Sequence, residues 1–122
     1  MPLITITTNV ECSPEGKAKL AQLINQEVTN THSGTPASHV HVHIMASEFL
    51  SFGGDANSPC ATVTVKCAAQ LLDGAARKSL VERIVPLLQS NLGCSPERTT
   101  TFFHEVPVEA IAVGTNIMVF SK

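Results

Sequence analysis

The sequence predicts an α/β fold in which two β-α-β repeats form a four-stranded mixed sheet with two helices on one face. Two observations indicate this architecture. Segments with alternating apolar and polar residues, typical of half-buried strands, are separated by segments whose apolar residues recur every three or four positions. The same order of signals occurs twice, about 60 residues apart, which indicates two copies of one unit.

The first repeat is expected over about residues 1–58. Residues 3–9 alternate as a strand, and Ser13 followed by Pro14 is typical of a helix N-cap. Glycine and proline within residues 31–36 end this helix, and residues 39–44 alternate as a second strand. The apolar stripe of the helix consists of Ala18, Leu20, Leu23, Ile24 and Val28.

The second repeat is expected over about residues 59–122, so that residues 1–122 form one domain. Residues 60–67 and 99–104 predict the third and fourth strands. Asp73 is expected to cap the second helix and Gly93 to end it. Residues 117–120 predict a short strand that can pair with a neighbouring chain. The second helical stripe consists of Leu80, Ile84, Leu87, Leu88 and Leu92.

The assembly follows from this arrangement. Right-handed crossovers place both helices on the same face of the sheet and leave the other face bare. A chain of 122 residues has no further element to cover that face. A closed cyclic oligomer covers it economically, and we expect a homotrimer.

Composition excludes several classes of protein. The net charge is −2 and the chain has neither Trp nor Tyr, so nucleic acid is not an expected partner. No apolar run is long enough for a membrane span and no signal-peptide pattern occurs, which favours a cytoplasmic location or secretion without a signal peptide. The four cysteines lack CxxC spacing and are expected to be reduced structural thiols. No cofactor is expected.

Pro2 is the candidate catalytic residue. Removal of Met1, which a small second residue permits, would leave Pro2 as a free secondary amine at the tip of a strand. An α-amino group titrates near about 7.7 to 8.0, and apolar surroundings disfavour its charged form. The unprotonated amine could then take a proton from carbon as a general base. The alternative is that Pro2 only begins a strand in which its missing N–H needs no partner.

Four motifs occur in an order and at spacings that cover nearly the whole chain. They are Met1-Pro2 before a strand ending in Thr8-Asn9, Phe52-Gly53-Gly54 followed by Ser58-Pro59-Cys60-Ala61, the segment from Leu92 to Arg98, and a C-terminal Gly-Thr pair near the last phenylalanine. In these motifs the chain resembles the tautomerase superfamily, specifically the macrophage migration inhibitory factor and D-dopachrome tautomerase family.

The resemblance implies a trimer with a pocket at each subunit interface. In such a pocket the N-terminal proline, here Pro2, moves a proton during keto-enol interconversion of aromatic α-keto acids or dopachrome-like compounds. It also implies substrate contacts at a backbone N–H at Ala68 and at His39, where the family often has an aromatic ring.

The chain departs from the family at three pocket positions. Thr35 stands where the family has a lysine, and Thr100 and Phe102 stand where an adjacent subunit commonly offers tyrosine and asparagine. Phe102 can lie against an aromatic substrate, but a carboxylate would lose a charge-assisted contact of about 1.5 to 3 kcal/mol. We therefore expect weak activity on the usual substrates. The family's Val-Gly-Trp segment corresponds either to residues 113–115 or to residues 111–113.

Three histidines, His39, His41 and His43, alternate along the second predicted strand. Histidines spaced in this way can present imidazoles to zinc, and a trimer axis would bring three copies together. No carboxylate or cysteine lies nearby in sequence to complete such a site. We therefore interpret them as polar residues and expect no metal.

The function that these observations favour is a keto-enol tautomerase, in which Pro2 acts as general base and then as general acid on a small aromatic or apolar carbonyl compound. The alternative is a non-enzymatic, cytokine-like protein that binds a protein receptor. A third reaction type, hydration or decarboxylation of a small acid, usually needs pocket arginines. Arg77, Arg83 and Arg98 fall on or beside the second predicted helix instead.

Overall fold

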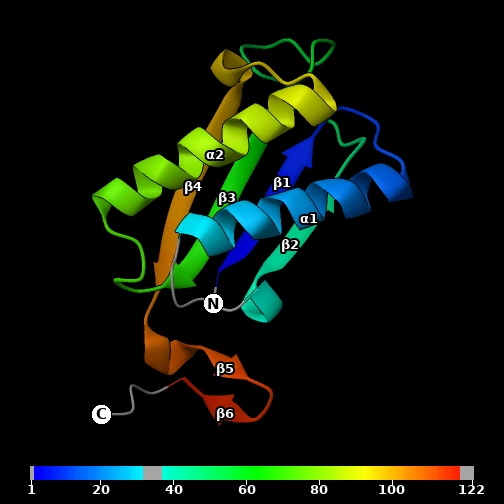
Figure 1. The fold of residues 1–122 in the computed structure, drawn as a ribbon. Coiled ribbons are helices and arrows are strands. Elements are labelled where there is room, and N and C mark those ends of the chain that lie inside the picture. The colour runs from blue at the N-terminus through cyan, green and yellow to red at the C-terminus, as the bar shows by residue number, and fades with distance from the viewer. Residues whose placement is uncertain (1, 32–36, 119–122) are drawn as a thin grey trace.

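A four-stranded sheet lies beneath two helices that run side by side across one of its faces (Figure 1). The computed structural model describes residues 2–31 and 37–118. In chain order the main elements are β1 (Leu3–Thr8), α1 (Pro14–Thr31), β2 (His41–Met45), β3 (Ala61–Ala68), α2 (Gly74–Leu92) and β4 (Thr99–Val106). Short 3₁₀ helices and a hairpin complete the fold: η1 (Ala37–His39), η2 (Pro96–Arg98), η3 (Val108–Ala110), β5 (Ala112–Val113) and β6 (Asn116–Ile117).

The sheet has the strand order β2-β1-β3-β4. β1 and β2 are parallel, as are β3 and β4, and each pair is connected through a helix. The two central strands, β1 and β3, are antiparallel. The prediction of two β-α-β units in one mixed sheet with both helices on one face is confirmed.

Both helices begin where their capping residues predict, and α2 also ends at its predicted capping residue. The Ser13 hydroxyl accepts a hydrogen bond from the backbone N–H of Gly16 at 3.0 Å. Asp73 does the same for Ala76 at 2.8 Å, at the start of α2. Gly93 follows α2 with φ of 76°, a left-handed conformation that glycine adopts without a Cβ clash.

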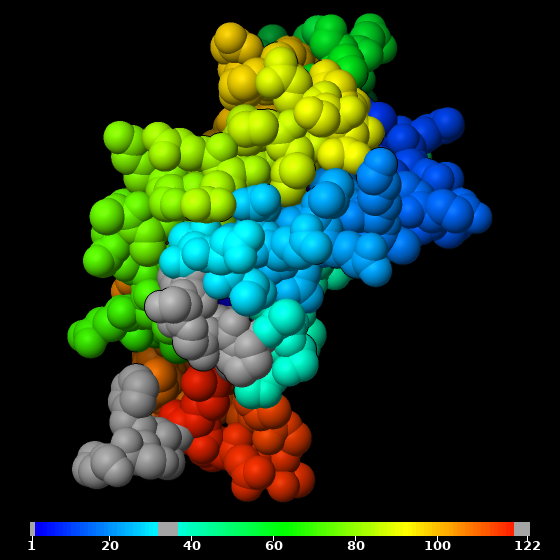
Figure 2. Space-filling model, in the orientation of Figure 1, coloured from blue at the N-terminus to red at the C-terminus, as the bar shows by residue number. Residues whose placement is uncertain are grey.

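The core fills the space between the sheet and the helices. Alternate residues of the central strands point toward the helices and are completely buried, among them Ile4 and Val65. The helix residues that meet them share the same degree of burial and include Leu20, Ile24, Val28, Leu80, Ile84 and Leu88. Each such side chain contributes roughly 1.5 to 3 kcal/mol by leaving water. In Figure 2 the two helices form a continuous layer over this core.

The opposite face of the sheet has no covering element among the described residues. Its central strands present threonines, such as Thr5 and Thr64, at the positions between the core residues. On the edge strand β4 the side chain of Phe102 is 51% exposed. A face of this kind is available to another subunit.

Three of the segments that carry the family resemblance meet at the end of the sheet where β1 finishes: Thr8-Asn9, residues 52–61 and residues 92–98. The Thr8 hydroxyl donates to the Cys60 carbonyl at 2.7 Å. The Arg98 guanidinium donates to the carbonyls of Phe52, Asp55, Ser58 and Pro59 at 2.9 to 3.2 Å. Segments far apart in sequence therefore form one hydrogen-bonded cluster at this end.

The C-terminal hairpin lies beyond the opposite end of the sheet, the end where β1 begins (Figure 1). β5 and β6 are antiparallel, and the backbone N–H of Met118 donates a hydrogen bond to the Ile111 carbonyl at 2.7 Å. Of the strand predicted over residues 117–120, residue 117 belongs to β6 and Met118 lies just after that strand, while residues 119 and 120 lie outside the described residues.

Candidate active site

A pocket of about 230 Å³ adjoins Pro2, where β1 begins. Much of its wall is apolar, because the start of β1, the end of β4 and the segment before the hairpin all contribute aliphatic side chains. These are Leu3, Val106, Ile111 and Ala112. The pocket thus provides the mostly apolar surroundings that the sequence analysis requires for Pro2.

The position of Pro2 is determined by the sheet. Pro2 is buried directly before β1, and its carbonyl accepts a hydrogen bond from the backbone N–H of His41 at 3.1 Å. This bond continues the pairing of β1 with β2. A nitrogen at this place therefore lies on a rigid strand, as precise acid-base chemistry requires.

Three polar or titratable side chains line the same pocket: His41, Lys66 and Cys67. Lys66 lies directly opposite Leu3 in the pairing of β1 with β3 and is exposed to solvent. None of the ion pairs among the described residues involves Lys66. Neither Lys66 nor His41 was predicted from the sequence to be a pocket residue.

Cys67 is another residue of the pocket wall, is only 2% exposed and belongs to the hydrophobic core. Burial raises the pKa of its thiol above the ordinary value, and the negative charge of Glu105 raises it further. Cys67 is therefore uncharged at neutral pH. A neutral thiol adds to the apolar character of the wall rather than acting as a nucleophile.

Of two predicted pocket residues, one does not lie on the strand where it was expected and the other lies outside the described residues. His39 was expected to share a strand face with His41 and His43, and this expectation is wrong because His39 belongs to the 3₁₀ helix η1. β2 begins two residues later, and its first residue, His41, is the histidine that lines the pocket. Thr35 lies outside the described residues.

The remaining predicted residues lie on β3 and β4. Ala68 is the last residue of β3, directly after Cys67, and is 5% exposed. Thr100 and Phe102 belong to β4, at the edge of the sheet. Neither is among the described residues that line the Pro2 pocket. Their expected role was on the pocket of an adjacent subunit.

The two alignments left open for the segment after β4 can now be compared. Ile111 and Ala112 line the Pro2 pocket, whereas Val113 is 44% exposed. Both alternatives stay open as alignments, and of their residues the described pocket contains Ile111 and Ala112. An aliphatic side chain, that of Ile111, covers this side of the pocket.

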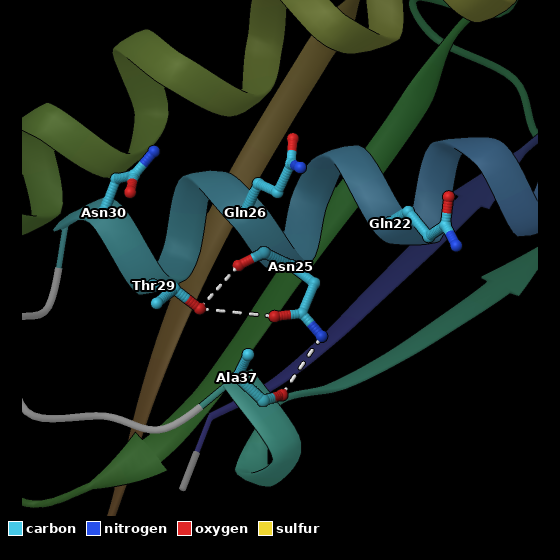
Figure 3. Close-up of a pocket in the computed structure, with 6 residues that line it drawn as sticks. All are labelled: Gln22, Asn25, Gln26, Thr29, Asn30 and Ala37. Carbon is cyan, nitrogen blue, oxygen red and sulfur yellow. Dashed lines mark hydrogen bonds between the residues drawn. The ribbon is translucent and has the colours of Figure 1, made fainter.

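A larger hollow, of about 450 Å³, lies over α1, and Figure 3 shows its lining. Asn25 donates from its side chain to the Ala37 carbonyl at 3.1 Å and accepts from the Thr29 hydroxyl at 3.3 Å. Among the described residues its lining consists of amide, hydroxyl and methyl side chains: Gln22, Asn25, Gln26, Thr29, Asn30 and Ala37.

A groove of about 540 Å³ between α2 and β4 is lined mainly by aliphatic, proline and threonine residues, with Glu82 as its titratable group. No cluster of three or more potential metal-binding side chains occurs within residues 2–31 and 37–118. In the same ranges, no helix combines the length and apolarity needed to cross a membrane. Of the pockets described, the one at Pro2 has the most acid-base groups.

Comparison with known proteins agrees with this geometry. The family model of macrophage migration inhibitory factor matches residues 1–121. This chain belongs to the macrophage migration inhibitory factor family. The resemblance drawn from the motifs is thereby confirmed over almost the whole length of the chain.

Individual proteins resemble the chain in sequence or in fold. The macrophage migration inhibitory factor of Xenopus tropicalis is 27% identical over 106 residues, which is 87% of this chain and 89% of that protein. The solved homologue from Prochlorococcus marinus has a TM-score of 0.86 at 22% identity and covers 96% of this chain and 99% of its own. The structure of Pt0534 inactivated by 2-oxo-3-pentynoate has a TM-score of 0.82 at 17% identity, with 95% and 94% covered. These structures share the fold.

Proposed function

We propose that this chain is a keto-enol tautomerase, an isomerase in which the amine of Pro2 moves a proton between oxygen and carbon of a small carbonyl compound. The observation that carries the proposal is the position of Pro2, buried at the start of β1 beside a mostly apolar pocket. Membership of the family supports it.

The reaction needs a free amine, and we propose that Met1 is removed. The apolar wall disfavours the ammonium form, so the nitrogen of Pro2 can accept a proton. In the direction from enol to ketone, the amine takes the proton of the enol hydroxyl and the resulting ammonium delivers a proton to the carbon of the double bond. The double bond shifts to oxygen and the amine is regenerated without any net change.

The solved structure of Pt0534 was obtained with that protein inactivated by 2-oxo-3-pentynoate. This compound carries a ketone conjugated to an alkyne, which is an acceptor for amines. We propose that the Pro2 amine of this chain reacts with it in the same pocket. The compound is therefore a direct probe for a free, unprotonated amine.

We also propose that the working form is a homotrimer. The pocket of one chain, at about 230 Å³, is smaller than the roughly 300 to 1,000 Å³ typical of small-molecule sites. The bare sheet face, with its exposed Phe102, offers a surface for association. In this assembly Thr100 of the partner subunit and Phe102 of the partner subunit would complete the site, as the family resemblance implies.

The decisive experiment measures ketonisation of the phenylpyruvate enol by the purified protein and by the Pro2→Gly variant, which has a primary amine without the pyrrolidine ring. Mass spectrometry of the intact protein first establishes that Met1 is absent. We expect a loss of at least about a hundredfold in kcat/KM, since general acid-base catalysis is worth roughly 10² to 10⁴. Pro14→Ala, at the start of α1, is the matched control and keeps full activity. Equal rates for the wild type and Pro2→Gly would refute the proposal.

A second candidate is a protein that acts by binding a receptor. The observation that favours it is Phe49, an aromatic side chain that is 88% exposed in the loop after β2. If Met1 is retained, the nitrogen of Pro2 is an amide and not a basic amine, and receptor binding becomes the better supported function. Hydration or decarboxylation has less support, because the three arginines near α2 are engaged elsewhere: Arg77 with Glu105, Arg83 with Glu27, and Arg98 with the loop before β3.

A further inference from the structure

Lys66 is the one lysine or arginine side chain that lines the Pro2 pocket within the described residues. We propose that Lys66 binds the anionic group of the substrate and so determines that this chain acts on carbonyl acids. It would replace the lysine that the family places at the position of Thr35. This inference rests on the proposed function of Pro2 and adds the specificity of the same site.

The strand pairing explains why Lys66 is at this place. Lys66 is aligned with Leu3 across β1 and β3, so it lies next to the strand residue that follows Pro2. Along β3, Lys66 falls at the position after Thr62 and Thr64 on the face away from the helices. Lys66 therefore lines the pocket from the face of the sheet that a neighbouring subunit covers in the proposed trimer, so its charge would lie at the subunit interface together with the rest of the site.

The charge of Lys66 is available to a ligand. Arg77, Arg83 and Arg98 each lie within 4.0 Å of a carboxylate, and so does Lys78, whereas Lys66 takes part in none of the ion pairs among the described residues. A lysine already paired with a carboxylate would be partly neutralised. An unpaired one attracts an incoming anion with its full charge.

The arrangement also orients the substrate. With its carboxylate at Lys66 and its carbonyl beside Pro2, a substrate would place its remaining atoms against Leu3, Ile111 and Ala112. Those aliphatic residues accept an aromatic or branched apolar group. The weak activity expected from the loss of a lysine at position 35 therefore need not follow, because a second lysine supplies the charge.

The test uses a charged probe and an uncharged one, 2-oxo-3-pentynoate and its methyl ester, and compares each variant with the wild type for the same probe. In each case the nitrogen of Pro2 bonds to the alkyne carbon remote from the ketone, one π bond of the alkyne breaks, and the proton of the nitrogen ends on the carbon next to the ketone. The adduct has the summed mass of protein and probe. Its rate of formation, followed by mass spectrometry of the N-terminal peptide that carries Pro2, reports binding and reactivity of that amine together and separates them from labelling of Cys12 or Lys66.

We expect Lys66→Gln to slow labelling by the acid about tenfold and to leave labelling by the ester unchanged. The effect is smaller than for a buried pair because Lys66 is exposed to solvent. Lys66→Arg restores most of the rate, and Lys19→Gln on α1, with the same loss of charge far from the pocket, has the wild-type rate. Added salt slows labelling of the wild type by the acid but not by the ester.

The two proposals fail in different ways. Equal labelling of Lys66→Gln and wild type by the acid would overturn the role of Lys66 while leaving the reactive Pro2 amine in place. Equal slowing with both probes would show a general defect of the pocket and would also overturn it. If neither probe labels Pro2 of the wild type, the tautomerase proposal itself fails, and the inference fails with it.

Discussion

The backbone N–H of Cys60 donates a hydrogen bond of 3.0 Å to the side-chain oxygen of Asn9, 51 positions earlier in the sequence. The same Asn9 amide group donates to the carbonyl of Ala56 at 3.0 Å and to that of Ser58 at 2.9 Å. A longer bond of 3.5 Å to the Leu50 carbonyl brings to four the backbone groups that the Asn9 side chain satisfies in the segment between β2 and β3. Asn9 holds the start of β3 against the end of β1.

Replacing Asn9 by alanine should lower the free energy of unfolding by about 2 to 3 kcal/mol, because partly buried backbone groups lose their partners. Urea denaturation measures the change. Asn9→Asp, which keeps the acceptor but loses both N–H donors, is expected to fall between alanine and wild type. An unchanged unfolding midpoint for Asn9→Ala would show that water replaces the side chain at no cost.

Arg98→Lys should be destabilising although it conserves charge. The planar guanidinium donates to four loop carbonyls and lies 5.4 Å from the centre of the Phe52 ring, and an ammonium cannot reproduce this fork. We expect a loss of about 1 to 2 kcal/mol. Arg83→Lys is the matched control, since Arg83 forms an exposed ion pair with Glu27 and should change stability by less than about 0.5 kcal/mol. Similar losses in both variants would contradict this account.

Asp55 should make part of the stability depend on acidic pH. Its carboxylate accepts backbone hydrogen bonds from Asn57 at 2.8 Å and Ser58 at 3.3 Å, and the first of these contributes most to lowering the pKa of Asp55 below its ordinary value. The folded state therefore holds this proton less tightly than the unfolded state. Its contribution is complete above about pH 4 and is lost as pH falls through the lowered value.

The Asp55→Asn variant tests this dependence, because an amide does not titrate. Urea midpoints measured between about pH 6 and pH 2 should show wild type more stable at the upper end, with the difference shrinking as the solution is acidified. Parallel profiles for the two proteins across that range would mean that Asp55 contributes nothing through its charge.

The cysteines should differ in reactivity. Cys12 is partly exposed, whereas Cys67 is buried and has a raised pKa, chiefly because of burial. Iodoacetamide at neutral pH should therefore label Cys12 well before Cys67, since the thiolate is the reacting form. Peptide mapping over time measures the order, and Cys12→Ser removes the fast phase. Rapid labelling of Cys67 in the native protein would show that the Pro2 pocket opens more widely than its structure indicates.

Much of the fold could be predicted from sequence because its signals are local. Alternation in β1 and β3 and the caps at Ser13 and Asp73 each depend on neighbouring residues, and the structure has them where expected. His39 was misassigned for the same reason. The alternation of histidines and valines is identical on both sides of Val40, and nothing local shows that a 3₁₀ helix precedes the strand.

The site could be predicted only in part because its composition depends on strand register. Pro2 was identified from its own chemistry. Lys66 was not, because it comes next to the start of β1 only through the antiparallel pairing of Leu3 with Lys66, a contact between residues 63 positions apart. The resemblance directed attention to Thr35, where the usual lysine is absent, and away from a lysine that another strand supplies.

β1 keeps the two ends of the sheet apart. Its six residues, at roughly 3.3 Å each, put about 20 Å between the hydrogen-bonded cluster at Asn9 and the pocket at Pro2. At that separation substitutions in one region should have additive rather than coupled effects on the other. Substitutions at Lys66 or Ile111 could thus change the specificity of the pocket without disturbing the hydrogen-bonded cluster around Asn9.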